Sequence, residues 1–323
     1  MKILVIRFSS IGDIVLTSPI LRCLKKQLPQ SELHYLTKKT YLPLLSNNPY
    51  IDQLHLLSEN EKHTLASLKK EAFDVVIDLH HNVRTFRIKN YLKTKAYSFP
   101  KLNIKKFLLT QFHINKLPKK HVVDRYFEAV KALGVKNDLK GIDYFLAESD
   151  HINTEEVGFS GEFIAVAIGA QFATKRLPNE KLIEILDGIN EPIVLLGGKE
   201  DVKNGEIIKV ALPTQKVINS CGKLTINQSA SLVSQAKVLL SHDTGLMHIA
   251  SAFETPIVLV WGNTVPQFGM YPYRENSATI KTHQVDNLSC RPCSKIGYSK
   301  CPKKHFRCMQ LHDSEKIKHD ITA

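Results

Sequence analysis

Residues 237–264 read KVLLSHDTGLMHIASAFETPIVLVWGNT, and this stretch decides the fold class. Two apolar runs flank a segment of helical spacing, and the polar turn Asp243-Thr244-Gly245 separates the first run from that helix. Short apolar runs predict buried strands, and a helix between two strands predicts that they pair in parallel. The stretch therefore predicts one turn of a doubly wound α/β sheet.

The same alternation continues through most of the chain. The sequence predicts further strands at 2–7, 32–37, 52–57, 73–79, 162–169, 191–198 and 215–219. It predicts helices at 19–28, 62–71, 124–134 and 225–236, a turn near 40–46, a helix after Pro178 and another ending near Leu212. We therefore expect two Rossmann-like, doubly wound parallel-sheet units that face one another across a cleft, with the carboxyl ends of the strands lining it.

The length and one irregular segment suggest where these units divide. A chain of 323 residues exceeds the usual single-domain size, so two domains are expected. Residues 135–161 are polar and rich in turn-forming residues, and they interrupt the strand–helix alternation. We place the domains at 1–155 and 156–323.

Composition narrows the class of protein. Hydrophobic residues make up 43% and charged residues 23% of the chain, which is ordinary for a globular protein. No apolar run approaches the roughly 18 residues that a membrane span needs, and the amino terminus does not have the pattern of a signal peptide. We expect a cytoplasmic protein whose six cysteines are mostly reduced.

The net charge of +13 is concentrated in the first half. Residues 1–150 hold 25 Lys and Arg against 14 Asp and Glu, whereas residues 151–323 hold 19 against 17. Residues 79–123 contain eleven Lys and Arg and no acid. Such a segment attracts nucleic acid, acidic lipid or a phosphorylated substrate, or it is simply a solvated lysine-rich surface. The absence of a helix-turn-helix, OB or RRM pattern argues against nucleic acid.

Three loops that follow predicted strands carry candidate ligand-binding residues. The helix start at Asp243-Thr244-Gly245 can hold a phosphate, although Asp243 or Thr244 can equally be a simple helix cap. Lys175 and Arg176 suit a diphosphate, or belong to a solvated basic loop. The acids at 200–201 either favour a helix start or bind ribose hydroxyls. None of these loops matches GxGxxG or GxxxxGK[ST], which argues against a Rossmann dehydrogenase and a P-loop NTPase.

The first strand leads into RFSSIGD, residues 7–13, which has two readings. Ser10 and Asp13 match the capping-box pattern, with Ser10 as the N-cap, and Pro19 then predicts a kink or a late helix start. Asp13 also follows a strand, at the edge where open α/β sheets bind ligands. A residue held rigid by its own helix can serve as both a cap and a catalytic base.

Four cysteines gather near the carboxyl terminus. Cys290, Cys293, Cys301 and Cys308 have the spacing CxxC–x7–C–x6–C. This spacing can close a structural zinc site, but it lacks a second CxxC pair. A reduced cluster is the alternative.

Four segments together resemble glycosyltransferase family 9, the bacterial ADP-heptose:lipopolysaccharide heptosyltransferases. They are SSIGDIVLTSP, GAQFATKRLP, SHDTGLMHIASAFETPIVLVWG and the tail CRPCSK…KCPKKHFRCMQ. The resemblance implies the GT-B fold, with the acceptor held by the first domain and the nucleotide sugar by the second. It implies inverting transfer of a heptose from an ADP-sugar to a lipopolysaccharide core or lipid A-linked acceptor, with no metal or cofactor.

The resemblance also implies roles for individual residues. Asp13 is the expected general base, and Ser10 and Gly12 belong to the acceptor loop. The expected donor contacts are Lys175 with the phosphates, Glu200 with the ribose, Leu224 near the adenine, and Asp243, Thr244, Gly245 and His248 with the diphosphate and sugar. Leu177 stands where the family more usually has tryptophan.

The implied acceptor is an acidic phosphorylated glycolipid. We therefore expect peripheral contact with the anionic inner face of the cytoplasmic membrane, and no binding of nucleic acid. Two alternatives stay open at this point. One is a GT-B enzyme that uses another nucleotide sugar and another glycan. The other is a non-catalytic protein that binds anionic ligands or nucleic acid.

Overall fold

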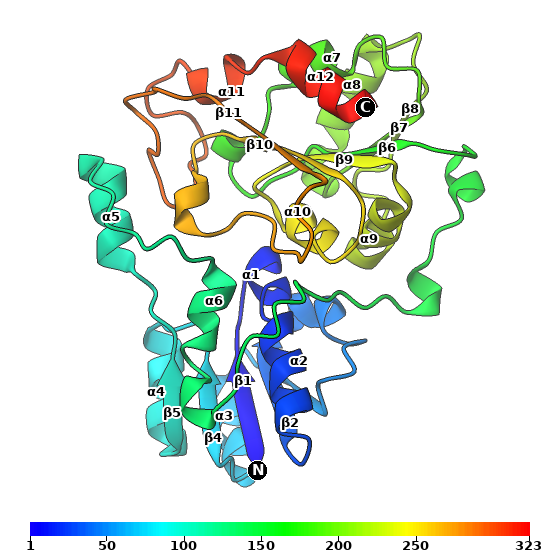
Figure 1. Ribbon diagram of the computed structural model, residues 1–323. Helices are drawn as coiled ribbons and strands as arrows, with labels where there is room; N and C mark the ends of the chain where they lie inside the picture. Colours follow the sequence, from blue (N-terminus) through cyan, green and yellow to red (C-terminus); the bar gives the residue numbers. More distant parts are fainter. The chain divides into compact units, whose positions relative to one another are not determined.

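The computed structural model describes residues 1–323 and separates into two compact units. Unit 1 comprises residues 1–102, 120–145 and 273–275; unit 2 comprises residues 103–119, 146–272 and 276–323. Each unit is built around its own parallel sheet with helices on both faces (Figure 1). The predicted fold class, two Rossmann-like α/β domains, is confirmed.

The sheet of unit 1 has the order β3-β2-β1-β4-β5, and all its strands are parallel. Its strands are β1 (Lys2–Ile6), β2 (Glu32–Lys38), β3 (Gln53–Leu57), β4 (Val75–Asp78) and β5 (Lys95–Ser98). Its helices are α1 (Ile11–Val15), α2 (Ser18–Gln27), α3 (Glu61–Lys70), α4 (Val83–Leu92) and α6 (Val122–Phe127), with 3-10 turns η1 (Lys39–Leu44) and η2 (Lys131–Leu133). The apolar residues of β1 and β4 are buried, which explains their near-continuous apolar sequence.

The sheet of unit 2 has the order β11-β10-β9-β6-β7-β8, again all parallel. Its strands are β6 (Ile164–Ala167), β7 (Ile193–Leu196), β8 (Val217–Asn219), β9 (Val238–His242), β10 (Ile257–Trp261) and β11 (Ile280–Gln284). Its helices are α5 (Asn103–Phe112), α7 (Asn179–Leu186), α8 (Val202–Ala211), α9 (Ile226–Gln235), α10 (Gly245–Ala250), α11 (Arg307–Gln310) and α12 (Ser314–Thr322). Its 3-10 turns are η3 (Glu148–Asp150), η4 (Thr154–Val157), η5 (Ala173–Lys175), η6 (Lys199–Asp201) and η7 (Pro266–Phe268).

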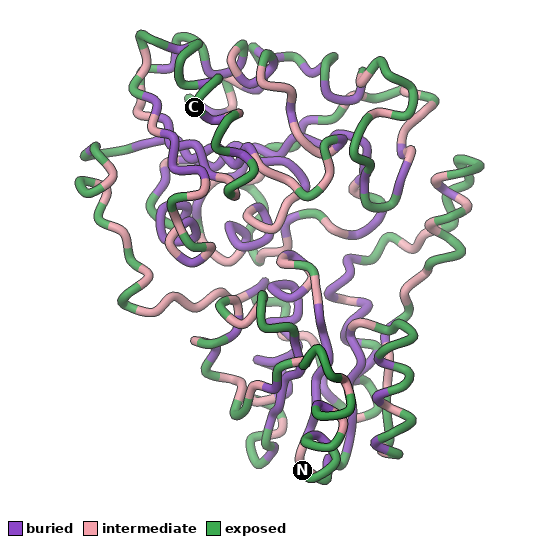
Figure 2. Tube along the Cα trace, turned by 180° about the vertical axis from the view of Figure 1, so that it is seen from behind, coloured by how far each residue is buried: buried purple, intermediate pink, exposed green.

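Apolar side chains cover both faces of the unit 2 sheet. One cluster joins the strands to α7, α8 and α12, and a second joins them to α9 and α10. Figure 2 shows the buried strands running through the middle of each unit while the outer turns are exposed. Because the sheet interior is fully occupied, loops at the strand ends are where ligands can reach it.

Several elements were not expected from the sequence. Helix α4 was not predicted because its basic residues interrupt the apolar spacing of the sequence. Its Ile88 and Leu92 pack against the unit 1 core, and its other face is charged. The edge strands β5 and β11 lack apolar runs, since an edge strand buries less of its surface. The break that Pro19 predicts is confirmed, because α1 ends at Val15 and α2 begins at Ser18.

The helix expected at 124–134 is wrong in its length. Helix α6 ends at Phe127, and Ala129 and Val130 are buried within the following turn. The apolar spacing of three and four residues therefore reports burial in a turn as well as in a helix. Gly134 ends the segment with a φ of 75°, as its position predicted.

The two units do not follow a single boundary after residue 155. Residues 103–119 belong to unit 2 because Leu109 packs against Val265 and Phe268. Residues 273–275 belong to unit 1, where the Tyr273 hydroxyl donates to the Asp124 carboxylate at 3.0 Å. Among all described residues, no helix is long and apolar enough to cross a membrane.

Candidate active site

Both sheets have a point at which the strand order reverses, and the expected site residues lie there. In unit 1 the chain runs outward from β1 to one edge and from β4 to the other. In unit 2 the same reversal lies between β9 and β6. Ligands of open α/β sheets bind beyond the carboxyl ends of the strands at such a reversal. The candidate loops are therefore those after β1 and β4 in unit 1, and those after β6 and β9 in unit 2.

Asp13 lies in α1, directly after the β1 loop, and its carboxylate is held by two residues. Ser10 donates to Asp13 Oδ2 through its hydroxyl at 2.8 Å and its backbone N–H at 3.3 Å. Arg7 forms an ion pair with Asp13 Oδ1 at 2.8 Å. One of the two hydrogen bonds of a capping box is thus present, because the Asp13 carboxylate accepts the Ser10 backbone N–H. The Ser10 hydroxyl donates to the same carboxylate.

Arg7 is the buried partner of this ion pair. Its side chain is 7% exposed, whereas that of Asp13 is 23% exposed. The guanidinium also donates to the backbone carbonyls of Ser9, at 2.7 Å, and Leu79, and it lies 5.9 Å from the ring centre of Tyr126. Burial acts to lower the pKa of Arg7, but the interactions with Asp13, Tyr126 and Tyr35 together outweigh it and raise that pKa. The arginine is therefore a fixed cation that orients a partly exposed carboxylate.

His80 completes this edge from the β4 side. Burial, followed by the charges of Arg7 and Lys101, lowers the pKa of His80 to about 4. The ring is consequently neutral at neutral pH, and it lies against Phe8 with the ring centres 5.0 Å apart. Asp13 is then the anionic group at this edge with a side chain that solvent reaches, which is what a base acting on a substrate hydroxyl requires.

In unit 2, Lys175 and Asp243 meet at the strand reversal. Lys175 Nζ lies 2.6 Å from Asp243 Oδ2 and 3.3 Å from its backbone carbonyl. Thr264, in the loop after β10, donates its hydroxyl to the same carboxylate oxygen at 2.8 Å. The carboxylate is only 9% exposed, whereas the lysine is 18% exposed. This edge therefore presents the cation, backed by a buried acid.

The helix start after Asp243 is built as a cap. Thr244 is the N-cap of α10 and accepts a hydrogen bond from the Met247 backbone N–H at 3.4 Å. Gly245 begins the helix, and His248 is buried within it. The capping alternative for Thr244 is thus what the structure contains, and it leaves the Gly245 backbone at the same edge as Lys175. The ligand contacts expected for Thr244, Gly245 and His248 stay predictions.

Two further loops extend this edge along β7 and β8. Arg176, whose side chain is 23% exposed, forms an ion pair with the buried Asp201 at 3.0 Å, and this contact holds the β7 loop in place. Glu200, beside Asp201 in η6, is exposed. Leu224, in the loop after β8, is half-buried against the second core cluster. The order of strands thus places Leu224, Glu200 and Lys175 in sequence along one edge.

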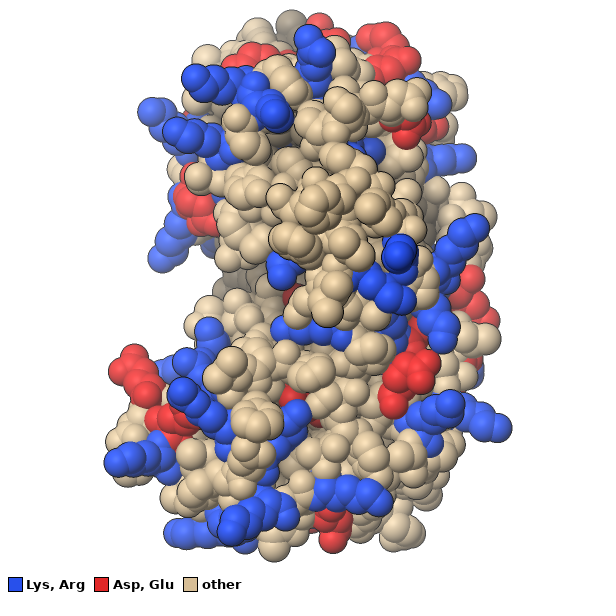
Figure 3. Space-filling model, turned by 90° about the vertical axis from the view of Figure 1, so that its left-hand side faces the viewer, with Lys and Arg blue, Asp and Glu red and all other residues tan.

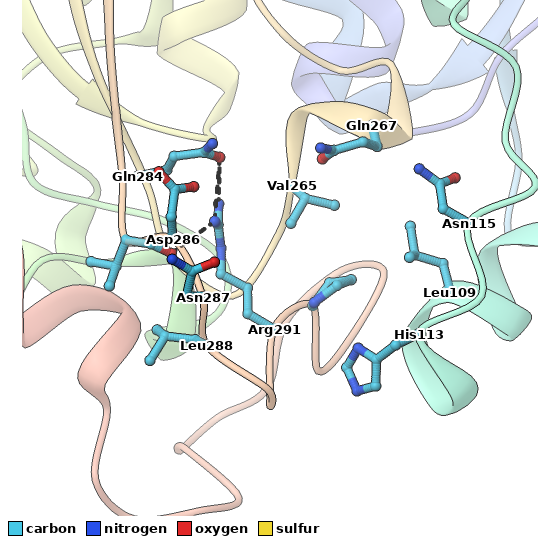
Figure 4. Close-up of a pocket in the computed structure, with 12 residues that line it drawn as sticks. Leu109, His113, Asn115, Val265, Gln267, Gln284, Asp286, Asn287, Leu288 and Arg291 are labelled. Atoms are coloured by element: carbon cyan, nitrogen blue, oxygen red, sulfur yellow. Dashed lines mark hydrogen bonds between the residues drawn. The ribbon is translucent and has the colours of Figure 1, made fainter.

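Arg291 ties the loops after β10 and β11 together. Its guanidinium donates to the carbonyls of Gly262 at 2.7 Å and Thr264 at 3.0 Å, and to the Gln284 side chain at 3.3 Å. Arg291 and Gln284 line a pocket of about 260 Å³ in unit 2 (Figure 4). Figure 4 shows Leu109, His113 and Asn115 of the α5 segment across this pocket from Val265 and Gln267.

The four clustered cysteines are free thiols in the structure. Burial and then the nearby thiols of Cys301 and Cys290 raise the pKa of Cys293 to about 11. Burial, with the same neighbours and Cys293, raises that of Cys308 to about 12. The zinc site stays a prediction for these residues.

A different group, His34, His55 and Glu71 in unit 1, has ligand atoms within 4.8 Å of one another. These side chains already have partners. His34 bonds His55 at 2.8 Å, and Lys2 bonds Glu71 at 3.0 Å. A metal ion would have to compete with the Lys2 ammonium for the Glu71 carboxylate. We therefore interpret the group as a hydrogen-bonded network that links β1, β2 and β3.

Arg7, His80 and Thr264 are site residues that sequence reasoning missed. Arg7 and Thr264 each follow an apolar strand within three residues, so a rule that examines every polar residue at a strand end would have found them. His80 follows β4, which was predicted, but its relevance depends on β4 lying beside β1. That pairing is a long-range feature that the local pattern does not contain.

Comparisons with known proteins find similarity along most of the chain. The model of glycosyltransferase family 9 (heptosyltransferase) matches residues 63–300. The chain is 26% identical over 323 residues to lipooligosaccharide heptosyltransferase 2 of Haemophilus influenzae, covering 92% of this chain and 93% of that one.

Solved structures share the fold. The structure of Escherichia coli ADP-heptose lipopolysaccharide heptosyltransferase II has a TM-score of 0.77 and 20% identity, covering 100% of this chain and 98% of that one. E. coli heptosyltransferase WaaC with ADP has a TM-score of 0.69 and 18% identity, covering 100% and 99%. Similarity therefore extends over both units and over nearly the whole chain.

Proposed function

The chain belongs to glycosyltransferase family 9, and from that premise we propose that it transfers a heptose from ADP-heptose to an acceptor of the lipopolysaccharide core. The proposal rests on two ion pairs, Arg7 with Asp13 and Lys175 with Asp243, which differ in whether the acid or the cation is more exposed. At the unit 1 reversal the acid is the more exposed partner, and at the unit 2 reversal the cation is. One edge is suited to accept a proton and the other to bind a phosphate.

The proposed reaction begins at Asp13. Its carboxylate takes the proton of an acceptor hydroxyl, and the acceptor oxygen attacks the anomeric carbon of the heptose. The bond from that carbon to the phosphate oxygen breaks, and ADP leaves with the electron pair. Attack from the face opposite the leaving group inverts the anomeric configuration. Arg7 keeps the carboxylate oriented through its ion pair at 2.8 Å.

The leaving diphosphate is the charge that unit 2 must stabilise. Lys175 supplies the positive charge, and the backbone N–H groups at the start of α10, from Gly245 onward, supply further donors. The Asp243 carboxylate fixes the lysine, because it is buried against Lys175 and Thr264, and its expected contact with the donor stays a prediction. The proposal needs no metal ion or cofactor.

We propose that the remainder of the donor lies along the same edge. Glu200 is exposed in η6 and can accept hydrogen bonds from ribose hydroxyls. Leu224 offers an apolar side chain for the adenine ring, one strand further on. His248 is buried within α10, and its expected contact with the diphosphate and sugar stays a prediction.

The acceptor that we propose is an acidic phosphorylated glycolipid, bound at unit 1 near Ser10 and Gly12. Unit 1 has a hollow beside α4 that is lined by Lys69, Arg87, Asn90, Tyr91 and Lys93, with three cations and no acid. Lys and Arg side chains outnumber Asp and Glu on the face drawn in Figure 3. Positive surfaces of this kind attract phosphorylated lipids and the anionic inner face of the cytoplasmic membrane, where we propose that the enzyme works peripherally.

The test is a transfer assay with the purified full chain. ADP-heptose and a deacylated lipopolysaccharide core that lacks heptose are the substrates, with UDP-glucose and GDP-mannose as alternative donors. We expect ADP release matched by a gain of one heptose on the acceptor, with inversion seen by NMR. Transfer from UDP-glucose or GDP-mannose but not from ADP-heptose would overturn the donor assignment. Binding of nucleic acid without any transfer would overturn the enzyme assignment.

A further inference from the structure

Helix α5 displays an apolar face to solvent. Ile104 is 78% exposed, Phe107 is 55% exposed and Phe112 is 61% exposed. These residues share one side of the helix because Ile104, Leu108 and Phe112 recur every four positions and Phe107 lies one turn from Ile104. The Phe107 and Phe112 rings contact each other edge to face, with centres 6.0 Å apart. Figure 2 shows this helix mostly in the colour of exposed residues.

The helix is nevertheless fixed to unit 2. Leu109, its only buried residue, packs in a small cluster with Val265 and Phe268. Figure 4 shows the Leu109 side chain directed into the pocket, toward Val265. The helix is therefore held by one side while the phenylalanine side is uncovered. Contiguous exposed apolar surface on a folded protein marks an interaction site.

Charge identifies what the apolar face meets. Lys105 and Lys106 lie within α5, Lys116 follows it, and residues 79–123 contain no acid. Phenylalanine and isoleucine on one side of a helix, with lysines beside them, are typical of helices that lie in the interface of an anionic bilayer. A second copy of this chain fits less well, because it would bring an equally basic segment and the chain carries +13.

We propose that α5 is the element by which the protein docks on an anionic membrane, with Ile104, Phe107 and Phe112 inserted among the lipids and the lysines at the headgroups. The inference rests on the proposed function only for the expectation that the acceptor is a membrane glycolipid. It assigns the contact to one helix of unit 2, separate from the basic hollow beside α4 in unit 1. Docking through α5 would hold the Val265 loop and the pocket beside it close to the bilayer surface.

Vesicle co-sedimentation tests the proposal with the full chain. The vesicles contain phosphatidylglycerol and phosphatidylethanolamine, and phosphatidylcholine vesicles serve as the neutral comparison. We expect the triple variant Ile104→Ser/Phe107→Ser/Phe112→Ser to bind the anionic vesicles at least about tenfold more weakly than the unaltered chain, because it loses apolar area that would enter the lipid. The matched control Val210→Ser/Leu311→Ser, which alters exposed apolar residues of unit 2 outside α5, keeps its binding.

A fluorescent reporter makes the test independent of the triple variant. The sole tryptophan, Trp261, is buried in β10 and does not meet solvent. In Phe107→Trp, we expect the emission to shift to shorter wavelength when anionic vesicles are added. Unaltered emission with vesicles bound, or equal binding by the triple variant, would overturn the role of α5.

Two more measurements separate the possible failures. Turnover of a deacylated core acceptor by the triple variant should match that of the unaltered chain, since α5 carries no residue of the proposed reaction. If no acceptor is used at all, the proposed function fails while α5-dependent vesicle binding still stands. If the chain is instead a dimer that the triple variant converts to a monomer, with no vesicle binding, the docking proposal is wrong and a second copy is the occupant.

Discussion

The two strand reversals of this protein share a topology and differ in which charge they expose. At β1 and β4 the arginine is 7% exposed and the aspartate 23%; at β6 and β9 the lysine is 18% exposed and the aspartate 9%. The buried partner in each pair fixes the exposed one. The fold therefore determines where a ligand meets the sheet, and the burial of each charged side chain determines whether an acid or a cation is available to that ligand.

The largest expected effect is on turnover at the unit 1 edge. Asp13→Asn keeps the size and the hydrogen-bonding shape of the side chain but cannot take up the acceptor proton. We expect kcat to fall by about 10²- to 10⁴-fold, the range that a positioned general base contributes. Steady-state ADP release measures it. A variant with unaltered kcat would remove Asp13 from the reaction.

Lys175→Ala tests the unit 2 edge. It removes the partly buried cation and leaves the buried Asp243 carboxylate without its ion-pair partner. We expect ADP-heptose affinity to fall about tenfold or more, and stability to fall by about 3 kcal/mol, as when one member of a buried pair is lost. Calorimetric titration and thermal unfolding measure the two effects.

The double variant Lys175→Ala/Asp243→Asn is the control that separates these effects. It removes the uncompensated charge, so most of the stability should return while the affinity stays low. Recovery of affinity together with stability would mean that Lys175 acts only through folding.

Acid should weaken unit 2 through His242, which directly precedes Asp243. Its Nε2 accepts the Leu177 backbone N–H at 3.1 Å, a bond that only the neutral ring can make. Burial and then the Arg176 charge lower its pKa to about 3, below the ordinary value near 6.5. The stability that depends on the neutral ring is fully present above about pH 6.5 and is lost progressively as the pH falls toward 3.

Thermal unfolding at pH 7.5 and pH 5 measures this loss. One such group lowers the free energy of unfolding by at most about 1.4 kcal/mol per pH unit below pH 6.5. Burial lowers the pKa of His312 to about 4, so His312 contributes a further loss of stability. We expect His242→Asn to be less stable at pH 7.5 but to show a shallower decline. A decline as steep as in the unaltered chain would exclude His242 as its source.

The smallest expected effect concerns Glu200. Because this side chain is exposed, losing a hydrogen bond to a ribose hydroxyl should weaken ADP-heptose binding by only about five- to tenfold in Glu200→Ala. Lys199→Ala, at the neighbouring exposed position of η6, is the matched control and should leave binding unchanged. Equal weakening in both variants would point to a general disturbance of the loop.

The sequence predicts much of this arrangement because buried parallel strands have conspicuous apolar runs. Nine strands were expected from such runs, including β1 and β9, and with them the loops that hold Asp13 and Asp243. The local sequence pattern does not show how deeply a charged side chain is buried or which strands pair. Arg7 and Lys175 are both cations that follow a strand, yet only the folded chain shows that the Arg7 side chain is 7% exposed and that of Lys175 is 18% exposed.

The segments that the sequence misjudged have a related cause. Helix α5 and helix α4 are both rich in lysine or arginine and bury few residues, so a pattern that depends on burial could not detect them. The place of residues 103–119 in unit 2 depends on Leu109 finding Val265 and Phe268, more than 150 residues later in the chain.

The unit 1 edge takes the acceptor proton and the unit 2 edge binds the donor phosphates, in the reaction that we propose. One side-by-side titration tests this assignment. ADP-heptose is titrated calorimetrically into the unaltered chain, Asp13→Asn and Lys175→Ala/Asp243→Asn. We expect an unchanged Kd for Asp13→Asn and a Kd raised about tenfold or more for the double variant. Weakened donor binding in Asp13→Asn together with an unchanged Kd in the double variant would contradict it.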